Sequence, residues 1–148
     1  MTFQSSHLQE DGIHLDCLKP LLRAAPNIAN LTLRGIEGAG TLEVILDKLT
    51  NLDVQYSVLN GDSLVNILSA CPNLESLKYD IGEIDDSGYN QFTISEARAA
   101  ILAHALNLNS LHLDRSYDWE DSWDDDDVAS MRRVMEERGI RLEVHLAS

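Results

Sequence analysis

The sequence predicts an α/β fold built from repeated units, each a helix followed by a short strand. Apolar residues recur with helical spacing and then change to the alternating spacing of a strand, and this change is repeated along the 148 residues. The hydrophobic and charged fractions, 44% and 24%, are those of a folded protein with its own core. We therefore expect a single domain over residues 1–148, made of about five irregular units.

The two clearest units share a helix that ends at a Pro-Asn pair. Residues 18–28 and 64–74 both place apolar side chains at i, i+3, i+4, i+7 and i+10, with Pro-Asn just before the last of them. The first four offsets follow one face of an α-helix, and a proline disfavours helical geometry at the residue before it. We therefore expect each helix to give way to a strand at this pair.

The strands are predicted from the alternation of apolar and polar residues. Residues 28–33, 74–79 and 108–113 alternate apolar with polar side chains, which indicates strands with one buried face. The third strand follows a helical face made of Ile101, Leu102, Ala105 and Leu108. The last unit has a helix at 128–139, with Val128, Met131, Val134 and Met135 on its apolar face, and a strand at 140–146.

A weaker unit lies between the first two. The apolar residues of 42–52 keep the helical offsets, with Thr50-Asn51 in the place of Pro-Asn, so they predict a helix and align Leu52 with Ile28 and Leu74. The strand near residues 53–58 then fits only with a one-residue shift. The spacings are 24 and 22 residues, within the range of about 20–29 for leucine-rich repeats. The next spacing, 34, implies an insertion.

Two insertions are expected, at residues 80–92 and 115–127. The first is rich in Gly, Asp, Ser and Asn and is predicted to be a surface loop.

The units Leu-x-x-Leu-Leu-x-x-x-Pro-Asn-Ile-x-x-Leu-x-Leu and Ile-Leu-x-x-Cys-Pro-Asn-Leu-x-x-Leu-x-Tyr resemble the irregular leucine-rich repeats of fungal F-box proteins. So does the ending, an acidic stretch followed by a helix at 128–138 and by Glu137–His145. The resemblance covers about residues 13–146. It implies a leucine-rich-repeat arc, a right-handed β-α superhelix with a parallel sheet on the concave side and helices on the convex side. It also implies the substrate-recognition region of a ubiquitin-ligase adaptor.

The beginning of the sequence departs from that family. F-box helices do not precede the repeats, and Thr2–Ser6 parallels Thr32–Gly35. We therefore expect a domain truncated at its N-terminus, inside a strand of an earlier unit. An uncapped edge of this kind predicts exposed apolar surface or self-association.

Polar residues of the strands are expected to face away from the helices, because successive side chains of a strand alternate. They form three columns on the concave face. The columns are Asn30, Ser76, Ser110 and Arg141; Thr32, Lys78, His112 and Glu143; and Arg34, Asp80, Asp114 and His145. We expect these residues to bind a protein partner by shape and polar complementarity.

Charge and composition exclude other classes of partner. The chain has 25 acidic and 11 basic residues, a net charge of -14, which repels nucleic acid and anionic membranes. Apolar runs fall short of the roughly 18 residues that span a bilayer, and the start does not resemble a secretory signal. Cys17 and Cys71 are interpreted as two buried thiols in a reducing compartment. We therefore expect an intracellular protein, cytoplasmic or nuclear.

Catalytic motifs are missing from the sequence, which lacks G-x-S-x-G and H-E-x-x-H, so we expect a non-catalytic protein without cofactor or metal. The glycines of Gly35–Gly40 are interpreted as the turn after a strand rather than a phosphate loop. A small hydrolase or metal protein using His112, Glu143 and His145 is an alternative. The two histidines are expected on adjacent strands, but a third zinc ligand does not stand out.

The acidic run between Asp114 and Asp127 holds eight acidic residues. We interpret it as helix capping and solvation, since Asp at a helix start caps free N–H groups, rather than as a calcium loop, whose spacing it lacks. Trp119 and Trp123 are interpreted as core anchors, with interface hot spots as the alternative. The run also supports an alternative function, an acidic leucine-rich-repeat protein that binds basic partners outside the ubiquitin system.

Overall fold

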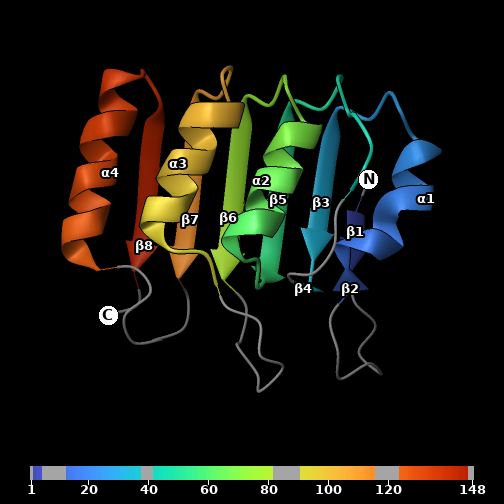
Figure 1. The fold of residues 1–148 in the computed structure, drawn as a ribbon, viewed down its shortest axis with the longest axis horizontal. Helices are drawn as coiled ribbons and strands as arrows, with labels where there is room; N and C mark the ends of the chain where they lie inside the picture. The colour runs from blue at the N-terminus through green and yellow to red at the C-terminus, as the bar shows by residue number, and fades with distance from the viewer. Residues whose placement is uncertain (1, 5–12, 38–41, 82–90, 116–123, 147–148) are drawn as a thin grey trace.

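The computed structural model describes residues 2–4, 13–37, 42–81, 91–115 and 124–146. A parallel sheet of six strands runs through this part of the chain in the order β1-β3-β5-β6-β7-β8, so neighbours in the sheet follow one another along the sequence. Helices α1 to α4 lie on one face of the sheet (Figure 1). The opposite face, which has none of these helices, is called the open face below. The predicted α/β class with a parallel sheet is confirmed.

The elements have the following bounds. The strands of the main sheet are β1 Thr2–Gln4, β3 Asn30–Arg34, β5 Asn51–Ser57, β6 Ser76–Ile81, β7 Ser110–Arg115 and β8 Arg141–Leu146. The helices are α1 Lys19–Arg23, preceded by the 3-10 helix η1 Leu15–Leu18, then α2 Gly61–Ala70, α3 Ile94–His104 and α4 Asp125–Glu137. A separate pair of short parallel strands is formed by β2 Ile13–His14 and β4 Ile36–Glu37.

The buried faces of the strands meet in a ladder of leucines. Leu31, Leu52, Leu77 and Leu111 are direct register partners on β3, β5, β6 and β7, and each is at most 3% exposed. The apolar residues of the predicted alternation are therefore on the buried face of the sheet, as expected. On β8 the equivalent Leu142 is only half-buried, because β8 is the edge of the sheet.

At the other edge, β1 lies beside β3. Thr2 is opposite Thr32 and Gln4 is opposite Arg34. The predicted equivalence of the first residues with β3 is confirmed.

A repeated hydrogen-bond pattern marks the entry to each strand. The carbonyl of Ala29 accepts from the N–H groups of Thr50 and Asn51, at 2.9 and 3.2 Å. The carbonyl of Thr50 accepts from Glu75 and Ser76 in the same way, and that of Glu75 accepts from Asn109 and Ser110. Each unit thus fixes the start of the next one, so the units are equivalent in backbone as well as in burial.

The predicted helix over 42–52 is wrong. Residues 42–50 are not helical, although Leu42, Leu46 and Leu49 are buried as an apolar stripe would require. Asn30 and its register partner Asn51 are 21 residues apart, against 25 for Asn51 and Ser76, which are joined through α2. A shorter connection has too few residues for a turn and a stable helix, because a helix must repay a costly first turn.

The structure also corrects the alignment of this unit. A four-residue turn precedes each strand, and its last N–H donates to the first carbonyl, in Ile28 to Ala25, Leu49 to Leu46 and Leu74 to Cys71. The residue equivalent to Ile28 is therefore Leu49, three positions before Leu52. The spacings become 21 and 25 residues, still within about 20–29.

The one-residue shift expected in this strand came from the alignment on Leu52 and disappears when Leu49 is aligned with Ile28. β5 does contain an irregularity that the sequence did not predict. β5 is in register with β6 from Asn51 to Val54, and the pairing resumes with Ser57 opposite Ile81. One extra residue therefore bulges from β5, and Tyr56 there has a positive φ of 50°. Because of the bulge, the alternation of buried and open-face side chains stops after Gln55, and the polar Ser57 is buried.

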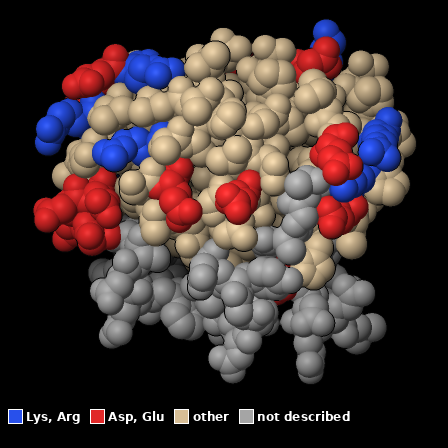
Figure 2. All heavy atoms as spheres, viewed as in Figure 1, with Lys and Arg blue, Asp and Glu red and all other residues tan. Residues whose placement is uncertain are grey.

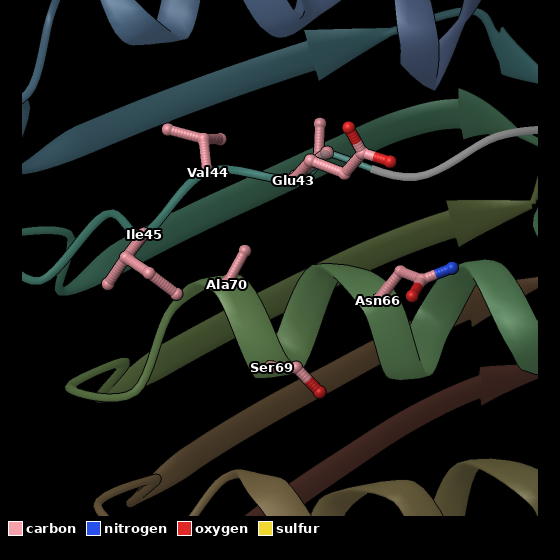
Figure 3. Close-up of a pocket in the computed structure, with 7 residues that line it drawn as sticks. Glu43, Val44, Ile45, Asn66, Ser69 and Ala70 are labelled. Carbon is pink, nitrogen blue, oxygen red and sulfur yellow. The ribbon is translucent and has the colours of Figure 1, made fainter.

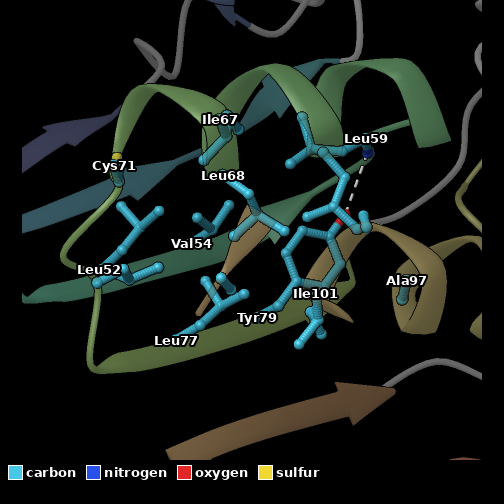
Figure 4. Packing of buried hydrophobic residues seen from close by; sticks show 14 of the residues in the cluster. Leu52, Val54, Leu59, Ile67, Leu68, Cys71, Leu77, Tyr79, Ala97 and Ile101 are labelled. Carbon is cyan, nitrogen blue, oxygen red and sulfur yellow. Dashed lines mark hydrogen bonds between the residues drawn. The ribbon is translucent and has the colours of Figure 1, made fainter. Parts of the chain in front are cut away.

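Tyr79 fills the core beneath this bulge (Figure 4). It is 1% exposed and occupies the position that Leu113 has on the next strand. Its hydroxyl accepts from the N–H of Leu59 at 3.1 Å, and it lies 2.9 Å from both Ser57 O and Gln91 Oε1. Since a phenol has one proton, it donates to one of these oxygens at a time. The hydroxyl thus joins the bulge, the start of α2 and residue 91.

The two cysteines have different environments, which corrects one prediction. Cys71 is buried as expected, and burial raises the pKa of its thiol to about 12. Cys17 is exposed, contrary to expectation. It lies in η1, whose three-residue period puts Leu15 and Leu18 on the buried side and turns Cys17 outward. Both thiols are free.

We expect Tyr79→Phe to lower the free energy of unfolding by about 1–3 kcal/mol, because it leaves the buried N–H of Leu59 without an acceptor. Burial also raises the pKa of Tyr79 above its usual 10.0. Ionisation therefore favours the unfolded chain, and this part of the stability is complete below pH 10 and is lost as pH rises further. Urea unfolding at neutral and alkaline pH measures both effects. Equal stability of the variant and the wild type at neutral pH would contradict the role of the hydroxyl.

Candidate interaction surface

The open face carries the three predicted columns, of which the first two are in register across the sheet and the third is interrupted at the β5 bulge. Each column begins on β3, at its first, third or fifth residue, which are Asn30, Thr32 and Arg34. From there each column continues onto the neighbouring strands through the residues predicted from the sequence. The first column is Asn30, Asn51, Ser76, Ser110 and Arg141; the second is Thr32, Asp53, Lys78, His112 and Glu143; the third contains Arg34 with Gln55, and Asp80, Asp114 and His145. The structure thus brings together all twelve residues predicted from the sequence.

β5 supplies Asn51, Asp53 and Gln55 to the columns. From the sequence, residues 53–57 were expected to extend the columns in an uncertain register, and Asn51 was missed. The alignment on Leu52 hid them, whereas an alignment on Leu49 gives Leu-Thr-Asn-Leu-Asp-Val, the same alternation as Ile-Ala-Asn-Leu-Thr-Leu in β3. The pattern needed to find them was therefore present in the sequence.

Side chains within the columns hold one another in place. Asn51 Nδ2 donates to Asn30 Oδ1 at 2.7 Å, and Gln55 Nε2 donates to Asp53 Oδ2 at 2.8 Å. The Arg34 guanidinium lies 5.8 Å from the ring centroid of Tyr56, a cation–π distance. These contacts fix polar groups on a rigid sheet, which lowers the entropy lost when a partner binds.

A compact cluster lies at the β7–β8 end of the open face. His112 Nδ1 is 3.1 Å from Glu143 Oε2, its direct register partner. The rings of His112 and His145 are stacked, with centroids 4.9 Å apart and planes 28° apart. The sequence named His112, Glu143 and His145 together only as an alternative metal or hydrolase site, and it left open whether a third zinc ligand exists. The spacing of Glu143 and His145, two residues apart on one strand, is the signal that could have shown it.

Charge is distributed differently on the two faces. On the open face, Arg34, Lys78 and Arg141 are interspersed with Asp53, Asp80, Asp114 and Glu143. On the helix face, Figure 2 shows few charged side chains over α2 and α3, while acidic ones gather at the start of α4. The open face therefore offers both signs of charge at close range, as a selective polar interface requires.

A cleft of about 370 Å³ lies between α2 and the segment that replaces the missing helix (Figure 3). Its lining residues are Leu42, Glu43, Val44, Ile45, Asn66, Ser69 and Ala70. Glu43 Oε2 is 3.3 Å from Lys19 Nζ, and Ile45 is 64% exposed. The hydroxyl of Ser69 in this lining lies 3.3 Å from Nδ1 of His104 on α3, an exposed contact that joins the two helices.

The end of the acidic run caps a helix, as predicted. Asp124 is the N-cap of α4, and its Oδ1 accepts from the N–H of Asp127 at 2.8 Å. Asp125, Asp126 and Asp127 form the first turn, where carboxylates complement the helix dipole. Residues 116–123 lie outside the described residues, and so do the predictions made for Trp119 and Trp123.

The first glycine of the cluster, Gly35, forms the predicted turn after β3. Gly35 follows β3 with a φ of 71°, and its N–H donates to Gln55 O at 3.0 Å. Residues 38–41, and with them the remaining glycines, lie outside the described residues. Of the helices in the described ranges, none is both long and apolar enough to cross a membrane.

Comparisons of the chain with protein-family models, with curated proteins and with solved structures find no match.

We expect Asp124→Ala to lower the free energy of unfolding by about 0.5–2 kcal/mol, because the N–H of Asp127 loses its acceptor. Asp126→Ala, in the first turn but not at the N-cap, is the matched control and should cost less. Thermal or urea unfolding measures both. Equal losses in the two variants would show that the run acts through its overall charge and not through the cap.

Proposed function

We propose that the chain is a leucine-rich-repeat arc whose concave, open face binds a protein partner, without catalysis. The observation that carries the proposal is the register of the three polar columns on the open face, above a ladder of buried leucines. Sequential parallel strands, each followed across the sheet by the next unit, are the arrangement that such repeats build.

The open face suits a folded or extended protein better than a small molecule. Its columns hold amides, hydroxyls and charges of both signs on a continuous sheet of six strands. Protein interfaces are recognised by this combination of a rigid surface and polar complementarity. Small ligands instead need a concave pocket that buries most of their surface.

The resemblance to fungal F-box proteins suggests which partner. On that resemblance we propose that the partner is a substrate of a ubiquitin ligase, presented by these repeats to a ligase that other parts recruit. This step depends on the family resemblance alone, since a fold does not determine a pathway.

A second candidate is an acidic repeat protein whose partners are basic and lie outside the ubiquitin system. It is favoured by the net charge of -14 and by the four aspartates at the start of α4. Its contact surface would be the helix face near α4 instead of the open face, so the two candidates differ in place as well as in chemistry.

We expect a photo-crosslinking residue at Arg34 or Lys78, on the open face, to capture one common protein from a fungal cell lysate. The same residue at Ala99 of α3 or Arg133 of α4, on the helix face, should not capture this protein. All four positions are exposed, so the comparison tests the face and not accessibility. Mass spectrometry identifies the product. Capture of the same protein from α3 or α4 but not from the open face would contradict the proposal.

Charge reversal provides the matched control for that experiment. Lys78→Glu and Arg141→Glu alter exposed side chains of the open face, and each should weaken binding of the captured protein at least about tenfold. Arg133→Glu makes the same change of charge on α4 and should leave the affinity unchanged. If the partner is a ligase substrate, it should also accumulate in cells that lack the chain.

For the second candidate, we expect binding of a lysine-rich peptide to weaken at least about tenfold between about 0.05 and 0.5 M salt, because exposed charges are screened. Asp125→Asn together with Asp126→Asn, which leaves the cap intact, should weaken it further at low salt. Fluorescence anisotropy measures both. Binding that is insensitive to salt and to these variants would count against this candidate.

A further inference from the structure

We propose that His112, Glu143 and His145 form a zinc site on the open face. One ligand atom from each residue lies within 4.8 Å of the other two, and His112 Nδ1 is already 3.1 Å from Glu143 Oε2. This inference does not depend on the proposed function, because it concerns three side chains of this chain and a metal ion alone.

The backbone explains why the three side chains converge. His112 and Glu143 are register partners on the adjacent strands β7 and β8. Glu143 and His145 are two residues apart on β8, so they project from the same face. The sheet therefore holds the three Cα positions, and the ligands can meet by side-chain rotation without movement of the backbone.

One of the three separations between ligand atoms is close to what zinc requires, and the other two are at most 4.8 Å. Zinc binds imidazole nitrogen and carboxylate oxygen at about 2.0–2.2 Å, which puts tetrahedral ligand atoms about 3.3–3.6 Å apart. The His112–Glu143 pair already has a similar separation. His145 and Glu143 are exposed and His112 is half-buried, so the stacked rings are free to turn towards a shared ion.

The ligand set favours zinc over calcium or magnesium. Two imidazoles and one carboxylate are a nitrogen-rich set, whereas calcium and magnesium take oxygen ligands. The Glu143 carboxylate supplies one negative charge to balance the ion. Asp114 lies opposite His145 in register, and its carboxylate adds negative potential beside the site. Three protein ligands leave a fourth position of the tetrahedron open to water.

Titration of the full chain with Zn²⁺ alone tests the proposal. At about pH 7.5, above the ordinary histidine pKa of about 6.5, we expect one ion to bind per chain with a dissociation constant in the micromolar range or below. Competition with a chromogenic chelator measures the affinity and separates this ion from weak binding to the many surface carboxylates. A dissociation constant weaker than about 1 mM would overturn the proposal.

Substitution identifies the ligands. His112→Gln, His145→Gln and Glu143→Gln should each weaken zinc binding at least tenfold. His104→Gln is the matched control, since His104 belongs to α3, contacts Ser69 at 3.3 Å, and should bind nothing at this site. Losses smaller than tenfold in both histidine variants would overturn the assignment.

A measurement on the wild-type chain guards against misfolded variants. In histidine-selective NMR spectra, one equivalent of zinc should shift the ring signals of His112 and His145 and leave those of His104 in place. Shifts confined to other histidines would overturn the proposal whatever the variants show.

Discussion

The in-register burial of one leucine per strand is the constraint on which the rest of the structure depends. Leu31, Leu52, Leu77 and Leu111 each cover part of the next, so no strand completes its core without its neighbour. The carbonyls of Ala29, Thr50 and Glu75 set the same register from the strand entries. Because side chains alternate, fixing the buried row also fixes the polar columns on the opposite face. Core and candidate interface are thus two sides of one alignment.

Much of the fold could be predicted from local patterns. The Pro-Asn pairs mark the ends of helices, and simple alternation identifies β3, β6, β7 and β8. Prediction failed where the pattern was ambiguous between two structures. Leu42, Leu46 and Leu49 have helical spacing, but the segment is not helical, because the length of the connection and not their periodicity decides its structure. The prediction for Cys17 failed for a different reason: it rested on the usual burial of free cysteines and not on the position of the residue, which η1 turns outward.

The candidate site was predictable in outline and less so in its chemistry. All twelve column residues follow from alternation and equivalence of the units. The cluster of His112, Glu143 and His145 needs the pairing of β7 with β8 as well as the sequence of each strand. Side-chain distances such as 3.1 Å between His112 and Glu143 depend on twist and rotamers, which a pattern of residues does not encode. The bulge at Tyr56 belongs to the same category, and the Tyr79 hydroxyl contacts Ser57 and Leu59 just after it.

The missing helix of the second unit has a consequence for cooperativity. Ser69 of α2 reaches His104 of α3, and Arg98 of α3 donates to Ser130 of α4 at 2.8 Å, so these three helices support one another in series. Towards α1, the non-helical residues 42–45 replace a helix in this series, and in the Lys19–Glu43 ion pair the glutamate side chain is 63% exposed. Fraying of the domain therefore starts most easily at this junction, where the first unit can detach while the remaining stack keeps its shape.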